Sequence, residues 1–269
     1  MKILELVGKD IPVAKGMEKP LLRELRTAEH VHGKNGLGNT CLPRPKKREE
    51  QKDAVNLIID KVKESPSEIT LVTAGPLTNL AVVVLKEPSI KQDFEEVIVM
   101  GGALEVPGNV TPAAEFNIYT DPEAAKIVFH SGLPITLVSL DVTMKRENGK
   151  VVNILTPDRL AEIESAGTPL TKFIGKMTRF YMEFSKKYEG IEGCYLHDPL
   201  AVAVAIDKNL VEPERLYVDV ETKGEITLGK TLGDLRKIPE CLKHEPNVNV
   251  CRNVCSERFL DMFVNSLKR

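Results

Sequence analysis

Two polar clusters in this sequence contain side chains that could bind a sugar-like molecule or act on it. The first combines Asn109, Glu115 and Asn117 within nine residues. Their amide and carboxyl groups offer donors and acceptors that suit sugar hydroxyls. A polar loop without function explains the same residues equally well, so this cluster alone leaves both interpretations open.

The second cluster is an adjacent histidine and aspartate, His197 and Asp198, at the start of an apolar stretch. Asp198 could be an oxygen ligand for a hard cation, and His197 a proton donor, because the ordinary pKa of histidine lies nearest neutrality. A purely structural role for both residues is also well supported. Asp198 followed by Pro199 is a good helix N-cap, and His197 could simply be hydrogen-bonded in the preceding loop.

A third candidate is the tight turn at residues 73–79, Thr-Ala-Gly-Pro-Leu-Thr-Asn, where a strand-like run passes into a helix. It is either an ordinary turn that connects a strand to a helix, or a turn that exposes backbone carbonyls and amides to a ligand. Cys241, His244, Cys251 and Cys255 have the residue types of a zinc site, but their spacing matches no common zinc signature. We interpret these cysteines as buried or spectator thiols.

The elements that must position these clusters follow an alternating pattern. Residues 69–73, 97–100 and 135–139 are short, β-branched and almost continuously apolar, as strands buried on both faces of a parallel sheet are. A strand is also predicted at 248–250. Helices are predicted over 48–64, 77–85 and 123–129, and helix starts at Asp121-Pro122, Thr156-Pro157, Asp198-Pro199 and Ser256.

This alternation of strands and helices predicts an α/β fold with a doubly wound, mostly parallel sheet flanked by helices, in one domain over residues 1–269. Ligands gather at the carboxyl ends of strands in such sheets, which is where the polar clusters fall. The beginning is unusual. Residues 2–7 look like the last turns of a helix that stops at Gly8, and a strand-like segment follows at 11–14. We therefore expect the chain to begin inside an element.

Composition excludes several classes of protein. The chain has 269 residues, a formal net charge of −2 and a pI near 6.3. These values give no electrostatic basis for binding nucleic acid or an anionic membrane. No apolar run is long enough to span a membrane, and no secretory signal is recognisable. Five scattered cysteines favour reduced thiols and a cytoplasmic location.

Taken in order, the motifs resemble the nucleoside hydrolase family, and the resemblance spans essentially the whole chain. The stretch His32-Gly-Lys-Asn-Gly-Leu-Gly38 is similar to the family's mobile loop beside the active site. The other matching segments are Ala74–Ala81, Val99–Gly102, Gly108-Asn109, Ala114–Asn117, Asp121–Ala124 and Leu196–Val202.

The resemblance implies hydrolysis of the N-glycosidic bond of ribonucleosides, with Ca²⁺ as cofactor and a small-molecule nucleoside as substrate. It implies that Asn109, Glu115 and Asn117 hold the ribose, with Met100 and His32 lining the pocket. Asp198 would ligate calcium by its side chain and Ala74 by its backbone carbonyl. His197 would be the general acid for the leaving base. Homo-oligomers are also implied.

Family members open with a strand that carries an Asp-rich motif, and this sequence contains no such cluster. We therefore expect an N-terminally truncated relative that lacks the first βα units, with weakened calcium binding and impaired activity. A non-catalytic riboside-binding or regulatory relative is the alternative. The sequence does not decide between purines and pyrimidines; Tyr181 and Tyr188 are candidates to contact the base.

Overall fold

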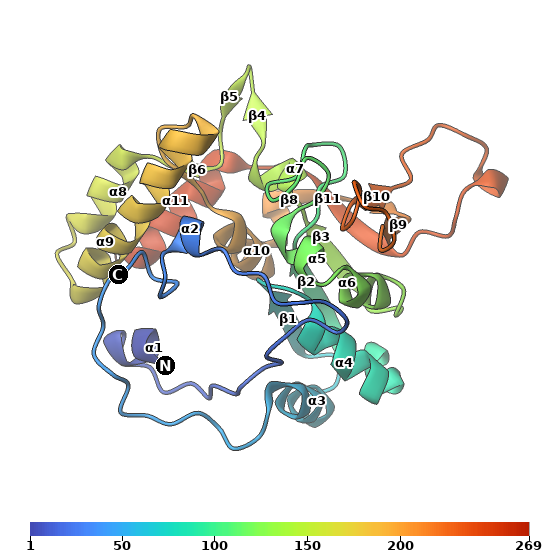
Figure 1. Ribbon diagram of the computed structural model, residues 1–269, viewed down its shortest axis with the longest axis horizontal. Coiled ribbons are helices and arrows are strands. Elements are labelled where there is room, and N and C mark those ends of the chain that lie inside the picture. The colour runs from blue at the N-terminus through green and yellow to red at the C-terminus, as the bar shows by residue number, and fades with distance from the viewer. Residues whose placement is uncertain (269) are drawn as a thin grey trace.

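The computed structural model describes residues 1–268 apart from the side chain at position 240. Figure 1 shows a central sheet with helices on both of its faces. In chain order, the elements are α1 (Lys2–Leu6), α2 (Glu29–His32), α3 (Ala54–Glu64), β1 (Ile69–Thr73), α4 (Thr78–Lys86), η1 (Pro88–Gln92), β2 (Phe94–Met100), α5 (Phe116–Thr120), α6 (Pro122–Phe129), β3 (Ile135–Val138), α7 (Leu140–Thr143), β4 (Arg146–Glu147), β5 (Lys150–Val151), β6 (Ile154–Leu155), α8 (Pro157–Glu164), α9 (Pro169–Phe184), η2 (Ser185–Glu189), β7 (Cys194–Tyr195), α10 (His197–Ile206), η3 (Lys208–Leu210), β8 (Val211–Leu216), β9 (Val218–Val220), β10 (Thr231–Gly233), η4 (Glu240–Leu242), β11 (Val248–Val254) and α11 (Ser256–Leu267).

The main sheet has the strand order β1-β2-β3-β11-β8. Strands β1, β2, β3 and β11 run parallel, and β8 pairs with β11 in the antiparallel direction at one edge. This confirms the predicted α/β class with a mostly parallel sheet. The carboxyl ends of the parallel strands therefore meet at one edge of the molecule, where Ala74 follows β1 and Gly101 follows β2.

Alternate residues of the strands enter two separate cores, because successive side chains in a strand point to opposite faces. Val97 and Val99 of β2 pack into one core with α3, α4 and α6, whereas Ile98 and Met100 pack into the other with α8, α10 and α11. The sheet is thus buried on both faces, which explains why its strands read as continuous apolar runs.

Two of the four predicted helix starts are confirmed as caps. Asp121 caps α6 and Thr156 caps α8, each through a hydrogen bond from a backbone N–H, and proline follows in the first turn of both helices. The prediction for 48–64 was wrong at its start, because Asp53 accepts from the amide of Asn56 and the helix begins at Ala54. Ser256 is the first residue of α11 rather than its cap.

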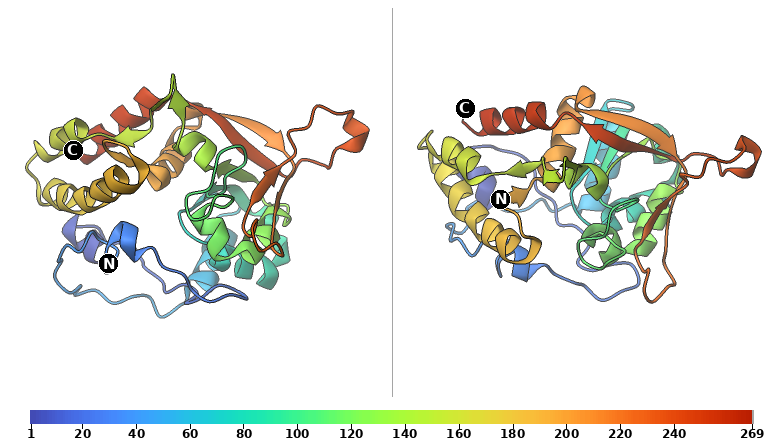
Figure 2. Two further views of the ribbon diagram at one scale, coloured as in Figure 1. Left: turned by 45° about the horizontal axis from the view of Figure 1, so that its top comes forward. Right: turned by 90° about the horizontal axis from the view of Figure 1, so that it is seen from above.

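The N-terminal segment is mostly irregular. Residues 1–53, the blue part of the chain, form a long arch from α1 to α3 beside the body of the fold (Figures 1 and 2). The helix predicted at 2–7 is present as α1, but residues 11–14 are not a strand. Among the described residues, their only backbone hydrogen bond to another segment is from the amide of Glu50 to the carbonyl of Val13, at 2.8 Å. Continuous strand pairing therefore does not form there.

No helix in the described part of the chain is long and apolar enough to cross a bilayer. All five cysteines are free thiols: Cys194 and Cys251 are buried, whereas Cys41, Cys241 and Cys255 are exposed. The four residues of the zinc-like pattern do not gather, since among residues 1–268 no group of three or more His, Cys, Asp or Glu side chains is arranged to hold a metal.

Candidate functional site

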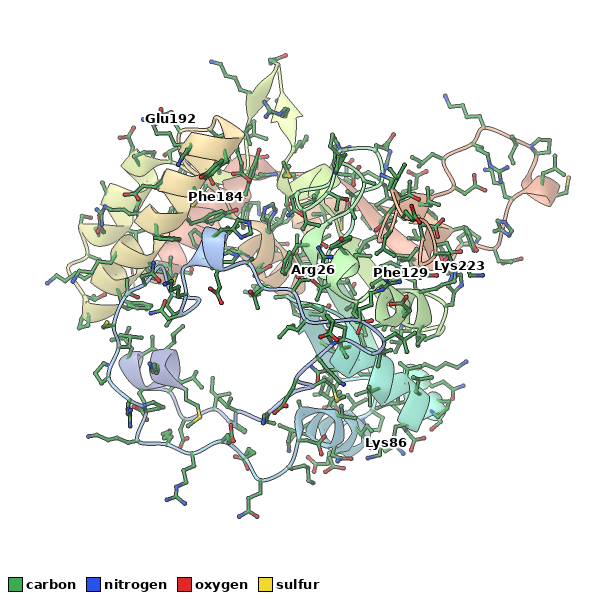
Figure 3. All side chains as sticks on the ribbon, in the orientation of Figure 1. Arg26, Lys86, Phe129, Phe184, Glu192 and Lys223 are labelled. Atoms are coloured by element: carbon green, nitrogen blue, oxygen red, sulfur yellow. The ribbon has the colours of Figure 1, made fainter. Side chains whose placement is uncertain are left out.

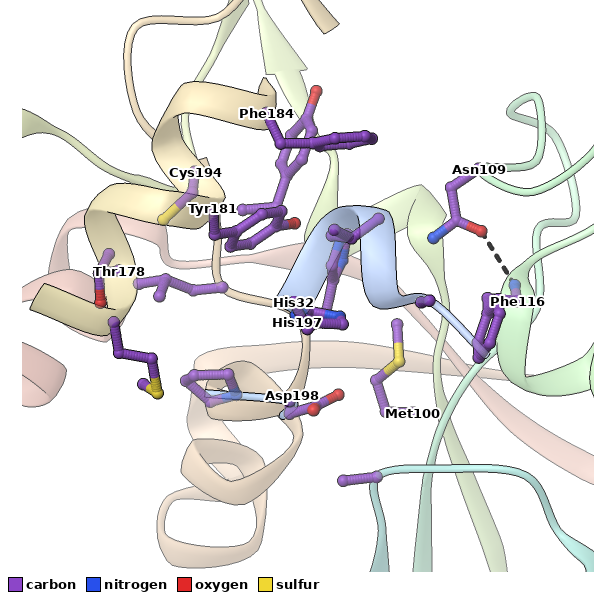
Figure 4. Close-up of a pocket in the computed structure, with 18 of the residues that line it drawn as sticks. His32, Met100, Asn109, Phe116, Thr178, Tyr181, Phe184, Cys194, His197 and Asp198 are labelled. Atoms are coloured by element: carbon purple, nitrogen blue, oxygen red, sulfur yellow. Dashed lines mark hydrogen bonds between the residues drawn. The ribbon is translucent and has the colours of Figure 1, made fainter. Parts of the chain in front are cut away.

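A pocket of about 830 Å³ lies at the carboxyl ends of β1 and β2. The eight site residues that the resemblance implied all line it, although they come from segments far apart in the chain. Figure 4 shows Asn109 and Phe116 on one side of this pocket, Tyr181 and Cys194 on the other, and the two histidines between them. The eight are His32, Ala74, Met100, Asn109, Glu115, Asn117, His197 and Asp198.

The polar side of the pocket is built around the start of α5. The Glu115 side chain is 2 % exposed and caps α5 by accepting the amides of Asn117 (2.9 Å) and Ile118 (3.1 Å). It also accepts the amide of Gly102 at 3.1 Å, which ties the end of β2 to the same helix. Asn117 donates its Nδ2 to the carbonyl oxygen of Met100 at 3.1 Å. Its carboxamide oxygen makes no protein hydrogen bond in the described residues.

Asn109 is held on the rim of this polar side. Its Oδ1 accepts the backbone N–H of Phe116 at 2.9 Å, the bond drawn in Figure 4. This bond fixes the orientation of the amide and leaves its NH₂ group available to a ligand. The polar side therefore offers donors and acceptors on rigid elements, as recognition of sugar hydroxyls requires.

The His197-Asp198 pair sits at the start of α10. The predicted N-cap role of Asp198 was wrong: α10 begins at His197, its N-cap is Leu196, and no side chain caps it. Asp198 lies inside the first turn instead, and it makes no hydrogen bond or ion pair with any residue in the described part of the chain. Its carboxylate is therefore available to a ligand that enters the pocket.

His197 is oriented by a residue that the sequence did not suggest. Its Nδ1 lies 2.7 Å from the hydroxyl oxygen of Thr143 in α7, and Thr143 is fully buried. Which ring nitrogen carries the proton depends on the tautomer, and this contact helps set it. No short-range pattern links residues 143 and 197, so only the fold brings them together.

Burial shifts the ionisation of the acidic and basic groups here. It lowers the pKa of the His197 imidazole to about 4, and the nearby His32 acts in the same direction. Burial raises the pKa of Asp198 to about 6. It also raises the pKa of Glu115 to about 7, although the three backbone amides that this carboxylate accepts act in the opposite direction. At neutral pH the imidazole is therefore uncharged.

The apolar side of the pocket is formed by α9 and by the 28–38 segment that packs against it. The rings of His32 and Tyr181 are 5.6 Å apart, and those of His30 and Phe184 are 5.7 Å apart. Gly38, at φ +60°, lies so close to α9 that a Cβ there would be 2.6 Å from the carbonyl oxygen of Met177. The two segments are thus packed backbone to backbone.

The two tyrosines named as candidates to contact a base differ in position. Tyr181 lines the pocket, whereas Tyr188 is 66 % exposed and is not among the lining residues. Phe184 and Phe116 line the pocket but were not predicted, because an aromatic residue in a helix has no sequence feature that distinguishes a ligand contact from core packing.

The residues that the structure describes do not by themselves fit a calcium site. Calcium takes ~6 to 8 oxygen ligands. Of the expected ligands, the pocket offers the carboxylate of Asp198 and the backbone of Ala74, and no acidic cluster stands beside them within residues 1–268. This donor set is too small to complete the coordination shell of the ion.

The chain is thus an α/β protein with a pocket at the carboxyl ends of its parallel strands, which is where proteins of this class bind small molecules. A sequence profile of the inosine-uridine preferring nucleoside hydrolases matches residues 1–261. The pyrimidine-specific ribonucleoside hydrolase RihA of Salmonella arizonae is 38 % identical over all of this chain and 83 % of its own length. The chain therefore belongs to the inosine-uridine preferring nucleoside hydrolase family, whose members are N-glycosyl hydrolases.

Solved structures agree with this assignment. The purine-preferring ribonucleoside hydrolase from Gardnerella vaginalis superposes with a TM-score of 0.89 at 34 % identity, covering 99 % of this chain and 83 % of that one. A plant nucleoside hydrolase, PpNRh1, also gives a TM-score of 0.89, at 35 % identity, with 99 % and 83 % covered. Pyrimidine-specific and purine-preferring relatives are similarly related to the chain, so overall similarity does not indicate its base preference.

Proposed function

We propose that the pocket binds a ribonucleoside, with the ribose against Asn109, Glu115 and Asn117 and the base toward His32 and His197. The observation that carries this proposal is the convergence of these side chains on one cavity of about 830 Å³ from separate parts of the chain. The polar groups lie on one side and the aromatic groups on the other, which matches the two halves of a nucleoside.

In this arrangement His197 contacts the leaving base through Nε2, because Nδ1 is occupied by Thr143. Because the imidazole is uncharged at neutral pH, it acts as a hydrogen-bond donor, and an Nε2–H bond to the departing base stabilises the negative charge that develops there. We assign Asp198 and Glu115 the stabilisation of the positive charge that develops on the sugar, because carboxylates stabilise such oxocarbenium-like states.

The direct test is titration calorimetry with uridine and inosine. We expect binding that weakens about 10-fold or more in Asn117→Ala, since a buried hydrogen bond to the ribose is lost. Asn253→Ala is the matched control, because Asn253 is exposed and its side chain bonds only to Glu212 in the part of the chain that the structure describes. Failure of both nucleosides to bind at millimolar concentration would end the proposal.

We further propose that turnover and calcium affinity are both low in this chain. The small donor set around Asp198 supports this, and we expect a calcium Kd of about 1 mM or weaker. Micromolar calcium binding, or rapid calcium-dependent release of ribose from either nucleoside, would contradict it.

The second candidate is a non-catalytic riboside-binding or regulatory relative. The small number of calcium donors around Asp198 favours it, because binding of a nucleoside without hydrolysis needs only the polar and aromatic sides of the pocket. Nucleoside binding without any release of reducing sugar would select this alternative over hydrolysis.

A role in nucleoside salvage, a cytoplasmic location and a homo-oligomeric state complete the proposal. The five unbridged thiols support the location, since disulfides are rare in the cytoplasm. Analytical ultracentrifugation tests the oligomeric state.

A further inference from the structure

The loop that carries Asn109 has no regular secondary structure of its own. It runs from Gly101, after β2, to Glu115, before α5. Its outer part, residues 106–113, is exposed or half-buried, and the backbone hydrogen bonds of this part run only to residues of the same loop. The position of Asn109 therefore depends on how the two ends of the loop are attached to the rest of the fold.

Two consecutive peptide groups near the start of this loop are held from both sides. The Nζ of Lys230 donates to the carbonyl oxygens of Ala103 at 2.7 Å and of Leu104 at 3.0 Å. On the opposite side, the carboxylate of Asp141 accepts the amides of Leu104 at 2.9 Å and of Glu105 at 2.8 Å. In each peptide group the oxygen thus faces a cation and the N–H faces an anion. Both charge-assisted bonds oppose rotation of the peptide plane.

Lys230 reaches this loop from the segment that leads into β10, and its two neighbours in the chain pack against the loop as well. A Cβ on Gly229 would lie 3.2 Å from the Cβ of Ala114, near the end of the loop. A Cβ on Gly102, near its start, would lie 2.8 Å from the Oγ1 of Thr231. Three consecutive residues therefore contact both ends of the loop.

The ammonium of Lys230 is committed to the loop. In the part of the chain that the structure describes it forms no ion pair, and its hydrogen bonds go to the two carbonyl oxygens. Burial lowers the pKa of Lys230, and the charge of Asp141 acts in the opposite direction. Because Ala103 is fully buried, loss of the ammonium would leave a buried carbonyl without this donor, which is unfavourable.

We propose that Lys230 is a positioning residue for ribose binding: with Asp141 it fixes the start of the 101–115 loop and thereby holds Asn109 at the rim of the pocket. This inference rests on the proposed nucleoside site. Neither Lys230 nor Asp141 lines the pocket, so both act through the loop. A loop that is ordered before the ligand arrives lowers the entropic cost of binding.

The first test is titration calorimetry of Lys230→Met, which keeps most of the length of the side chain but removes its charge and donors. We expect uridine and inosine to bind about 5-fold or more weakly than to the wild type, since the loop must then be ordered during binding. Lys223→Met is the matched control, because Lys223, labelled in Figure 3, is exposed in the loop between β9 and β10. It should bind like the wild type, and equal losses in both variants would overturn the proposal.

A double-mutant cycle with Asn109→Ala shows whether Lys230 acts through Asn109. If it does, Lys230→Met weakens binding by less than about 2-fold in the Asn109→Ala background, because no positioned amide remains to be lost. A general loss of stability or of pocket shape would weaken binding equally in both backgrounds. Additive effects of the two substitutions would therefore overturn the proposal.

Hydrogen exchange gives a readout that needs no ligand. We expect the amides of Leu104 and Glu105 and those of residues 106–113 to exchange faster in Lys230→Met than in the wild type, while the amides of α4 are unchanged. Asp141→Asn weakens the other side of the same attachment and should give the same pattern. Unchanged exchange of the loop in both variants would refute the attachment.

The binding results separate this inference from the proposed function. If the wild type binds both nucleosides and Lys230→Met binds them equally well, this inference fails and the nucleoside site stands. If the wild type binds neither nucleoside, the nucleoside site fails, and with it the role of Lys230 in binding.

Discussion

The Nδ1 of His197 and the hydroxyl oxygen of Thr143 lie 2.7 Å apart, although 54 positions separate these residues in the chain. Thr143 belongs to the short helix that follows β3, and His197 opens the helix that follows β7. The contact makes Thr143 a positioning residue, because it restricts both the rotation and the tautomer of the imidazole.

Thr143→Val tests this role. Valine keeps the shape of threonine but cannot hydrogen-bond, so we expect the tautomer ratio of His197 to change and nucleoside turnover to fall about 10-fold or more. Ring ¹⁵N chemical shifts measure the first effect and ribose release the second. Thr143→Ser retains the hydroxyl and should preserve both; identical spectra for Thr143→Val and wild type would refute the role.

Asp121 should contribute strongly to stability. Its buried carboxylate accepts the hydroxyl of Thr78 at 2.6 Å and the amides of Leu21 at 2.9 Å and Ala124 at 3.1 Å. Asp121→Ala leaves all three donors unsatisfied, and we expect a loss of about 3 to 5 kcal/mol in the free energy of unfolding. Urea denaturation measures it. Asp53→Ala removes an exposed helix cap and should lose clearly less stability than Asp121→Ala.

Glu115 should make stability depend on pH. Burial raises the pKa of this carboxyl in the folded state to about 7, above its ordinary value of 4.5. The folded state therefore binds the proton more tightly than the unfolded state. This contribution is complete below pH 4.5 and is lost as pH rises through 7, which amounts to about 3 kcal/mol.

The measurement is the free energy of unfolding between pH 4.5 and 8 for wild type and Glu115→Gln. The variant cannot ionise at this position, so its decline over that range should be smaller by that amount. Parallel curves for the two proteins would contradict the assignment.

The five thiols should divide into two reactivity classes. Burial raises the pKa of Cys194 and of Cys251 to about 12, and only the thiolate reacts rapidly. We expect Ellman's reagent to label the three exposed cysteines of the native protein quickly and all five in denaturant. Rapid labelling of five thiols without denaturant would show that the two cores open readily.

Much of the fold could be predicted because its signals are local. Continuous apolar runs identified the strands, since each strand packs on both faces. Asp121 and Thr156 identified helix starts because a cap and a following proline act within one turn. The prediction failed where tertiary contacts decide, as at residues 11–14, which have strand-like residues but no neighbouring strand to pair with.

In the site, too, residues with a local sequence signal could be predicted and residues that depend on tertiary contacts could not. The eight expected residues could be named because the short motifs that contain them resemble those of the nucleoside hydrolase family, whereas the residues alone left a purely structural role open. Thr143 could not, because it matters only through its contact with His197, which is distant in sequence. Asp198 shows a third case: its N-cap signal was good, but α10 begins one residue before it, which leaves the carboxylate free.

The close packing of Gly38 on the backbone of Met177 has a consequence for protein engineering. A chimera that takes α9 from a relative with another base preference would meet a foreign 28–38 segment at a contact with no room for a β-carbon. Transplanting both segments together preserves that fit, so in this family they should be exchanged as one module.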